Sequence, residues 1–265
     1  MALGILRHFD LAALPVDGAD ALHLQIEAMK LAFADAYRYV SDPATMEFEP
    51  AKLLDDAYLE RRAKAIDLKR AQAHGPGEPR AGGTVYLTTA DASGMMVSYI
   101  QSNYMGFGSG VVVPGTGISM QNRGAGFSLE PGHPNLVGPG KRPFQTIIPG
   151  FLTLDGKPVM SFGVMGGQMQ PQGHAQMVTR IVDWRQNPQA ASDGPRWIVN
   201  ADFSVSFESS RFAPGVLDEL ASRGHRIVDP EAAMFGFGGA QLIWRFEDGY
   251  CAGSDHRKDG HAIGF

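Results

Sequence analysis

The sequence predicts an α+β protein whose sheets pack together with helices outside them. Three observations support this class: a helical period in the first 70 residues, strand-forming residues and turn signals from Thr84 onward, and one later helical stretch before a C-terminal hairpin. Helices followed by strands, a helix and more strands form an order typical of layered domains. The chain has 265 residues, 44% of them hydrophobic, so it can bury one large core in one or two domains.

Two helices and a linker are predicted before residue 84. Asp20 can cap a helix that ends near the Ser-Asp-Pro at 41–43. Apolar residues recur along this helix at the 3.6-residue period: Leu22, Ile26, Met29 and Phe33. A second helical run covers residues 55–69, where charged residues alternate with Ala and Leu. Residues 72–83 then lack any period and are rich in Gly and Pro, which indicates an exposed linker.

Strands dominate the sequence after this linker. Residues 84–90 and 95–102 are rich in strand-forming side chains and flank a turn at 91–94, so they are predicted to form a hairpin. One helix is predicted from 172 to 185. Further strands are expected at five places: near Val112, 147–154, 159–164, 240–246 and 250–252.

Charge and composition exclude several classes of protein. The net charge is −5 and no Lys/Arg stripe appears, so there is no nucleic-acid footprint. The single cysteine, Cys251, excludes an internal disulfide and a zinc site built from several thiolates. No apolar run reaches the roughly 18 residues of a membrane helix, and no signal peptide is visible. We therefore expect a cytoplasmic protein without a membrane partner. The eight histidines, among them His133 and His174, follow no metal-binding pattern, and no metal or cofactor is expected.

One junction in the sequence contains a candidate catalytic residue. The linker ends in Gly-Gly, and Thr84 opens a strand directly after Gly83. A threonine hydroxyl is a poor nucleophile at neutral pH unless a base lies beside it. Cleavage between Gly83 and Thr84 would free an α-amine with a pKa of about 8, and this amine could serve as the base of the same residue. Alone the motif is weak, because most Gly-Gly-Thr sequences are ordinary junctions between a loop and a strand.

Several further blocks, in the same order along the chain, resemble the γ-glutamyltransferase family. The blocks that carry the resemblance are residues 84–91, 106–118, 140–143, 163–167 and 253–260. Residues 1–83 resemble the C-terminal helical part of the family's large subunit, with the exposed linker at 72–83, and residues 84–265 resemble its small, catalytic subunit. A family proenzyme is about twice as long, so the resemblance implies that its N-terminal half is absent here.

The resemblance implies a fold and a set of catalytic roles. The fold is the four-layer αββα sandwich of the N-terminal-nucleophile (Ntn) hydrolases, incomplete without the missing half. Self-cleavage after Gly83 would expose Thr84, whose hydroxyl would form an acyl-enzyme. Ser102 matches a second hydroxyl that hydrogen-bonds the nucleophile, although a strand serine facing solvent is the alternative. Gly166 and Gly167 match an oxyanion hole built from backbone N–H groups, although a tight turn after a strand would also explain them.

The residues expected in the substrate pocket depart from the family pattern. Gly126 stands at the position of the acidic residue that holds a donor amine, and Arg123 stands where a neutral amide is usual. Gln145 and Thr146 replace a pair of serines, and Tyr104 replaces an asparagine. Arg123 would repel an ammonium group and attract a carboxylate. This pattern resembles a divergent branch that includes the oxamate amidohydrolase, and it favours a small amide that bears a carboxylate.

Several alternatives stay open at this point. Gln168, Gln170 and Gln172 follow the glycine pair and either line the pocket or only cap a helix. The favoured function is an Ntn-type amidohydrolase, the first alternative is a genuine γ-glutamyltransferase or glutathione hydrolase, and the second is an inactive fragment or structural subunit. The expected partners are a small-molecule amide or γ-glutamyl substrate and either a missing large-subunit segment or a second copy of the chain.

Overall fold

The computed structural model describes residues 1–73, 83–229 and 236–265. The chain divides into two compact units, each built from segments that are distant in the sequence. Unit 1 comprises Met1–Arg80, Arg123–Gln145 and Trp197–Ala233, and unit 2 comprises Ala81–Asn122, Thr146–Arg196 and Met234–Phe265. Residues 74–82 of the predicted linker lie outside the described residues. The predicted division of the chain at Gly83–Thr84 concerns a cleavage, and it stays a prediction.

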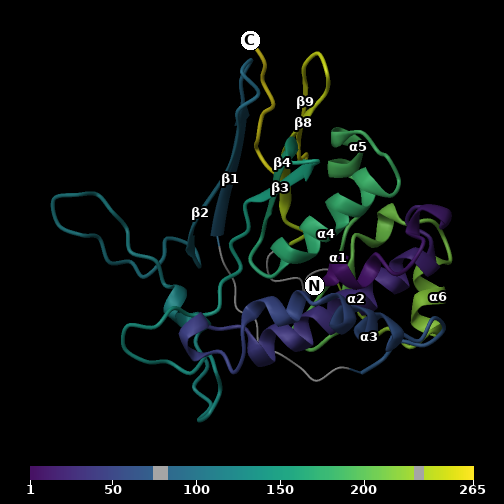
Figure 1. Ribbon diagram of the computed structural model, residues 1–265, viewed down its shortest axis with the longest axis horizontal. Coiled ribbons are helices and arrows are strands. Elements are labelled where there is room, and N and C mark those ends of the chain that lie inside the picture. Colours follow the sequence, from purple (N-terminus) through teal and green to yellow (C-terminus); the bar gives the residue numbers. More distant parts are fainter. Residues whose placement is uncertain (74–82, 230–235) are drawn as a thin grey trace. The chain divides into compact units, whose positions relative to one another are not determined.

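Unit 1 combines helices with a small sheet. Its helices are α1 (Ala2–Leu6), α2 (Ala19–Tyr39), α3 (Asp56–Lys64) and α6 (Val216–Ser222). Its sheet has the order β5 (Trp197–Val199), β6 (Val205–Phe207) and β7 (Ile227–Val228). The central element is α2, whose predicted apolar stripe is buried where it packs against α1, α3, α6 and β5 (Figure 1). Across the described residues, no helix combines the length and the apolar character needed to span a membrane.

A buried chain of polar groups, here called the Glu27 cluster, lies inside unit 1. Lys30 Nζ lies 2.9 Å from Glu27 Oε1 and 3.3 Å from His225 Nδ1, and His225 Nε2 lies 2.7 Å from His23 Nδ1. His23 Nε2 lies 2.7 Å from the Asp67 carbonyl oxygen, which only accepts, so this nitrogen carries the proton. Each member then donates to the next, from Lys30 through His225 to His23, with both imidazoles neutral. Burial lowers the pKa of His225 to about 3 and also lowers the pKa of His23, in agreement with neutral rings.

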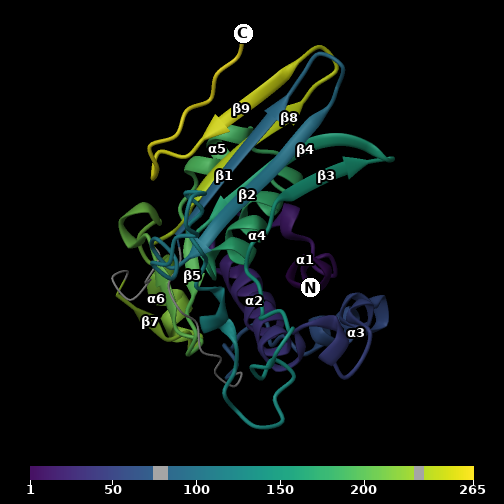
Figure 2. The ribbon, with the colours of Figure 1, turned by 90° about the vertical axis from the view of Figure 1, so that its left-hand side faces the viewer.

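In unit 2, a hairpin lies on a four-stranded sheet. The hairpin pairs β1 (Gly83–Ala90) with β2 (Met96–Tyr104), which confirms the predicted hairpin. The larger sheet is antiparallel, with the order β3 (Gly150–Leu154), β4 (Lys157–Met165), β8 (Gly239–Arg245) and β9 (Tyr250–Ser254). Figure 2 shows the hairpin lying across this sheet, where β1 contacts both β4 and β8.

One aromatic side chain sets the close approach of the hairpin to the sheet. Tyr86 of β1 is buried, and a Cβ atom at Gly163 of β4 would lie only 2.3 Å from its ring. The Tyr86 hydroxyl lies 2.8 Å from Ser98 Oγ, and burial raises the pKa of Tyr86 to about 12, so the phenol stays neutral. Because Gly163 leaves room for this ring, β1 packs directly on β4, and Thr84 at the start of β1 is held by that packing.

Two helices cover the other face of the four-stranded sheet. They are α4 (Met169–Val182) and α5 (Pro188–Asp193), and Figure 1 shows both on the side away from the hairpin. A Cβ atom at Gly173 of α4 would lie 2.4 Å from Val164 Cγ1, so the helix lies close against β4. The buried core between these layers includes Met160, Phe162, Val164, Met177, Ile181 and Leu242. The α+β class is therefore observed, and unit 2 contains a hairpin layer, a sheet layer and a helix layer.

Two N-terminal predictions require correction at helix ends. Gly18, rather than Asp20, precedes the first turn of α2, and Asp20 lies within that turn. The second predicted helix, 55–69, is shorter, because α3 ends at Lys64. Its last predicted turn is replaced by a turn in which the Asp67 carboxylate accepts hydrogen bonds from the Lys69 and Arg70 N–H groups.

Three predictions in unit 2 also require correction. The strand expected near Val112 is only an isolated bridge to Ser119, within the loop that follows β2. The helix predicted at 172–185 begins and ends three residues earlier, and Arg185, beyond its end, adopts a φ of 52°. Strand β3 begins at Gly150 instead of 147, since the Ile148 N–H donates to a side chain instead of to a neighbouring strand.

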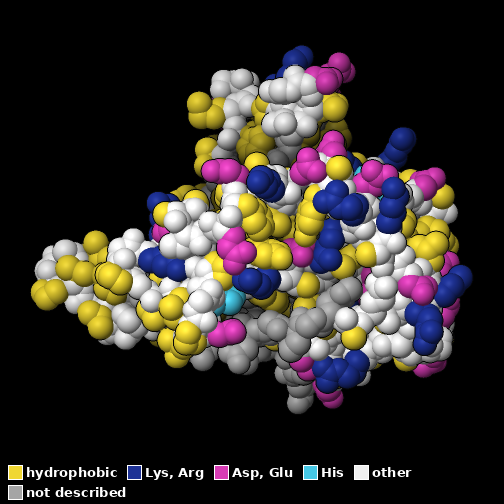
Figure 3. Space-filling model, turned by 60° about the horizontal axis from the view of Figure 1, so that its bottom comes forward, with side chains coloured by type: hydrophobic (Ala, Val, Ile, Leu, Met, Phe, Trp, Pro, Cys, Tyr) yellow, Lys and Arg dark blue, Asp and Glu magenta, His cyan; other side chains and the backbone are white. Residues whose placement is uncertain are grey.

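The loop that follows β2 projects from the body of unit 2. It carries exposed apolar side chains, and Figure 3 shows hydrophobic groups gathered on this projection. The exposed residues are Phe107, Val111, Val112, Ile118 and Met120. Phe107 is 91% exposed, which is unusual for an aromatic residue.

Candidate active site

Thr84 lies at an irregular point of the hairpin. Gly83 pairs with Tyr104 and Val85 pairs with Gln101, so the register shifts at Thr84. An irregularity of this kind turns a side chain away from the direction it would take in a regular pleated strand. The Thr84 side chain is half-buried, and its Oγ1 donates a hydrogen bond of 3.1 Å to Ser102 Oγ. The two hydroxyls predicted to act together are therefore in direct contact.

Ser102 is itself held by the backbone of β2. Its Oγ accepts a hydrogen bond of 2.9 Å from the Tyr104 N–H. Tyr104 is buried and has a φ of 77°, a conformation that non-glycine residues seldom adopt. This backbone conformation directs the Tyr104 N–H toward Ser102. The strained residue at the end of β2 therefore orients the Ser102 hydroxyl.

The predicted oxyanion glycines form the junction between β4 and α4. Gly166 has a φ of 121° and Gly167 a φ of 59°, and their carbonyl oxygens accept from the Met169 and Gln170 N–H groups at 3.0 Å. A Cβ atom at Gly166 would lie 3.1 Å from Met169 Cβ and 3.2 Å from Gly238 Cα. Both the backbone conformation and the packing therefore require glycine at Gly166. The junction is a tight turn. The oxyanion-hole role of its N–H groups stays a prediction, with which a tight turn is compatible.

The side chain of Gln170 also reaches Thr84. Its side chain is fully buried, with Nε2 3.4 Å from Thr84 Oγ1 and Oε1 2.9 Å from the Ile148 N. The sequence left open whether Gln168, Gln170 and Gln172 line a pocket or cap a helix. Gln172 donates to the carbonyl oxygen of Gln168, which precedes α4, whereas the side chain of Gln170 extends away from the helix to contact Thr84. A polar residue three positions after the glycine pair was the sequence signal for this contact.

The expected pocket residues divide between the two units. Thr146 belongs to unit 2 and is buried. Arg123 and Gln145 belong to unit 1, where Arg123 is 2% exposed in a short 3-10 turn and Gln145 is exposed. Gly126 ends the same turn as Arg123, and its carbonyl oxygen accepts from Asn135 Nδ2 at 2.7 Å. The structure thus brings together Thr84, Ser102, the Tyr104 backbone and Gln170 within unit 2, and describes Arg123 and Gln145 within unit 1.

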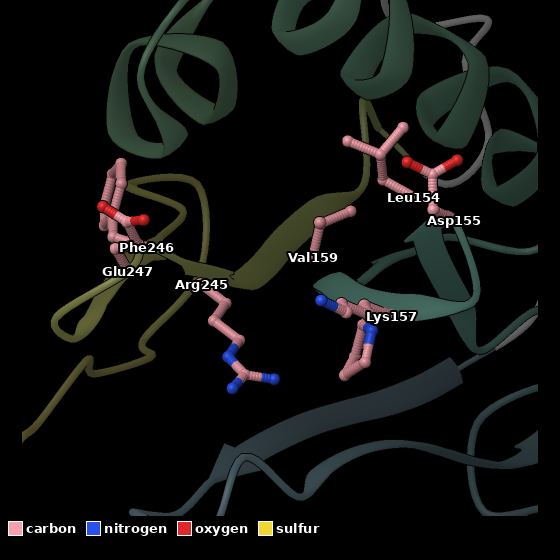
Figure 4. Close-up of a pocket in the computed structure, with 8 residues that line it drawn as sticks. Leu154, Asp155, Lys157, Val159, Arg245, Phe246 and Glu247 are labelled. Atoms are coloured by element: carbon pink, nitrogen blue, oxygen red, sulfur yellow. The ribbon is translucent and has the colours of Figure 1, made fainter.

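A surface hollow elsewhere in unit 2 is distinct from this site. It measures about 440 Å³ and is lined by the β3–β4 turn and the end of β8, including Lys157, Arg245 and Glu247 (Figure 4). Lys157 begins β4, whereas the glycine pair follows Met165, which ends the same strand. The hollow therefore lies at the opposite end of β4 from the candidate site, and it contains none of the predicted residues.

Comparisons with known proteins agree with these observations. The γ-glutamyltranspeptidase family model matches residues 1–265. The oxamate amidohydrolase proenzyme of Klebsiella pneumoniae subsp. pneumoniae is 38% identical over 271 residues, which cover 99% of this chain and 50% of that protein. The glutathione hydrolase-like YwrD proenzyme of Bacillus subtilis is 34% identical over 272 residues, covering 100% of this chain and 51% of that protein.

A solved structure is similar over the same extent. The cephalosporin acylase of Bacillus halodurans shares 49% identity and a TM-score of 0.87, covering 98% of this chain and 47% of that chain. The chain thus spans about half the length of the curated relatives it matches, and these relatives are hydrolases. The resemblance inferred from the sequence blocks is confirmed: the chain belongs to the γ-glutamyltranspeptidase family.

Proposed function

We propose that this chain is the catalytic portion of an Ntn-type amidohydrolase that is cleaved between Gly83 and Thr84. The observation that carries the proposal is the hydrogen bond of 3.1 Å from Thr84 Oγ1 to Ser102 Oγ. It gives the threonine hydroxyl a defined direction at the start of β1, where cleavage would free the amine of the same residue. The family membership and the hydrolases among the relatives support the same reaction class.

The reaction proceeds through an ester on Thr84. The Thr84 amine takes the hydroxyl proton while Oγ1 bonds to the amide carbonyl carbon, and the resulting oxyanion is held by N–H groups of Gly166 and Gly167. The C–N bond breaks as the amine returns the proton to the leaving nitrogen. Water then attacks the ester carbonyl by the same route, which releases the acid and restores the Thr84 hydroxyl. Ser102 accepts the hydrogen bond that orients Oγ1 before the attack.

The substrate proposed is a small amide that carries a carboxylate. Arg123 supplies a cation for the carboxylate, and Gly126 offers no acidic side chain for a donor amine. Tyr104, Gln145 and Thr146 are the other residues that the sequence pattern assigns to substrate binding. The 38% identity to an oxamate amidohydrolase supports the assignment, because oxamate has a carboxylate and no amine. A genuine γ-glutamyltransferase is the second candidate, supported by the family match, and an inactive structural subunit is the third.

The complete enzyme requires further chain, either a large-subunit segment or a second copy. The outward face of the hairpin supports this part of the proposal, because it exposes the apolar residues Val85, Leu87, Val97 and Tyr99. An apolar sheet face of this kind is normally covered. Unit 2 supplies a hairpin, a sheet and a helix layer, and a helix layer over the outward face would complete the four-layer αββα sandwich of the Ntn fold.

Intact mass and substrate release test the proposal together. Cleavage would give a species that begins at Thr84 and contains residues 84–265, about 20 kDa of the 28.5 kDa chain. The cleaved protein is expected to release ammonia from oxamate faster than it releases p-nitroaniline from γ-glutamyl-p-nitroanilide. Preference for the second substrate would favour the transferase. A chain that stays joined and releases neither product would favour the structural subunit.

A further inference from the structure

Gln170 lies between the proposed nucleophile and a backbone segment of unit 2. It occupies the first turn of α4 with no solvent exposure, and its amide contacts Thr84 Oγ1 at 3.4 Å and the Ile148 N at 2.9 Å. A fully buried carboxamide with partners on both sides has a single orientation, so each of its two contacts can be assigned a direction.

The Ile148 N–H determines that direction. A backbone N–H only donates, so the group of Gln170 that faces it is the carbonyl oxygen. The NH₂ group therefore faces Thr84, and an amide NH₂ only donates. In the uncleaved chain, where the Thr84 nitrogen is still a peptide amide, Thr84 Oγ1 thus accepts a hydrogen bond from Gln170 and donates one to Ser102 Oγ. Two neighbours with opposite roles leave the hydroxyl with one arrangement of its hydrogen atom.

The position of Gln170 is reinforced by the helix behind it. His174 Nδ1 lies 2.6 Å from the backbone carbonyl oxygen of Gln170, and burial lowers the pKa of His174 to about 4. At neutral pH the ring is neutral, and because a carbonyl oxygen only accepts, Nδ1 carries the hydrogen atom. The close contact of Gly173 with Val164 holds the same turn of α4 against β4. The donor that faces Thr84 is therefore preorganised before any substrate binds.

We propose that Gln170 is a further catalytic residue, whose carboxamide stabilises the negative charge that develops on Thr84 Oγ1. The charge develops when Oγ1 loses its proton and attacks, and again when Oγ1 leaves as the ester is hydrolysed. Gln170 keeps its own protons throughout and only strengthens its hydrogen bond. The N-terminal end of α4, where Gln170 lies, adds a partial positive charge that favours the same change. This inference rests on the proposed role of Thr84.

A thiol at position 84 reports on this hydrogen bond without any need for turnover. The variant Thr84→Cys in a Cys251→Ser background contains one thiol, whose pKa follows from the pH dependence of its alkylation. Adding Gln170→Met removes the donor while keeping an unbranched side chain, and Gln172→Met removes a buried carboxamide of the same helix as the control. All proteins are compared in the same processing state, established by intact mass.

The Gln170 NH₂ group stabilises the thiolate of Thr84→Cys as it would the alkoxide of Thr84. We expect the pKa of the thiol at position 84 to be about 1 pH unit higher with Gln170→Met, because a hydrogen bond to a charged group is lost. The control Gln172→Met is expected to leave this pKa unchanged. Equal thiol pKa values with glutamine and methionine at position 170, in proteins with the same circular dichroism, would overturn the inference.

A second measurement uses Gln170→Glu in the enzyme that retains Thr84. A carboxylate still accepts from the Ile148 N–H but cannot donate to Oγ1, whereas a protonated Glu can. The ratio of kcat/KM in the variant to that in the wild type is therefore expected to rise at least tenfold as pH falls from 8 to 5. A ratio that stays flat would contradict the inference, since a purely structural role through Ile148 is retained. A raised thiol pKa without any turnover by the Thr84 protein would instead contradict only the proposed function.

Discussion

Two polar clusters of this chain, one in each unit, differ in kind. The Glu27 cluster of unit 1 contains a carboxylate, an ammonium group and two imidazoles, each at most 3% exposed. The Thr84 cluster of unit 2, formed by Thr84, Ser102 and Gln170, is neutral, and Thr84 stays half-buried. The first cluster ends on backbone groups, at the Asp67 carbonyl oxygen and the Gln72 N–H. The second converges on the hydroxyl of Thr84.

This difference predicts that the Glu27 cluster contributes mainly to the stability of the fold and the Thr84 cluster mainly to catalysis. Opposite charges that are fully buried hold one another in place, and removing one partner leaves the other without compensation. Neutral hydroxyl and amide groups cost less to bury and can be accessible to a substrate on one side. We therefore expect changes in the Glu27 cluster to lower the free energy of unfolding, and changes in the Thr84 cluster to lower turnover. The predictions below test that separation, from the largest effect to the smallest.

Removal of the proposed nucleophile, Thr84, has the largest expected effect. Thr84→Ala should abolish both the cut after Gly83 and substrate hydrolysis, because no hydroxyl remains to attack either carbonyl. The free energy of unfolding should fall by only about 2 kcal/mol, since the two hydrogen bonds of Thr84 Oγ1 are lost. Intact mass, ammonia release and urea unfolding measure the three quantities. Thr84→Ser keeps the hydroxyl and should retain the cut, and a cut in the alanine variant would disprove the assignment.

Breaking the buried ion pair should act on stability instead. Lys30→Met leaves the Glu27 carboxylate buried without its cation, and the free energy of unfolding should fall by about 3–5 kcal/mol. Urea denaturation measures this loss. Lys64→Met removes the cation of the exposed pair with Glu60 and should cause no measurable change. Folded Lys30→Met protein should still hydrolyse substrate, and a selective loss of turnover at full folding would refute the separation.

Loss of the second hydroxyl should reduce turnover without abolishing it. Ser102→Ala removes the acceptor of both the Thr84 hydroxyl and the Tyr104 N–H, so kcat should fall about 100-fold, equivalent to about 2.7 kcal/mol. Ser102→Thr keeps an acceptor at the same place and should recover most of the rate. Steady-state kinetics on cleaved protein decides the matter, and an alanine variant with wild-type kcat would remove Ser102 from the mechanism.

The smallest effect concerns the slope of stability against pH, to which one histidine contributes at most about 1.4 kcal/mol per pH unit. His225 has a native pKa of about 3 against 6.5 when unfolded, so the unfolded chain binds the proton first as the pH falls. The stability that neutral His225 contributes is present above pH 6.5 and is lost progressively between pH 6.5 and 3. Urea unfolding of His225→Asn should therefore depend less steeply on pH across this window, with a remaining slope from His23 and His174. An unchanged slope in His225→Asn would contradict the neutral, buried ring.

Patterns that repeat within a few residues were readable from the sequence. The stripe from Leu22 to Phe33 predicted α2, and alternation with turn residues predicted the β1–β2 and β8–β9 hairpins. The motif blocks, read as a resemblance, identified the family and singled out Thr84 and Ser102. Strands of two or three residues, such as β5 and β7, left no periodic signal, because a period needs several residues to appear.

Only the tertiary structure decided which side chains contact Thr84. Gln170 is 86 residues away in the sequence, and its contact with Oγ1 exists because Gly163 admits Tyr86 and Gly173 admits Val164, which bring β1 and α4 to the same strand. The Glu27 cluster likewise joins His23 to His225 across 202 residues. The sequence by itself determined local conformation and the chemical type of each side chain. Partners across such separations depend on how whole layers pack, which no local pattern encodes.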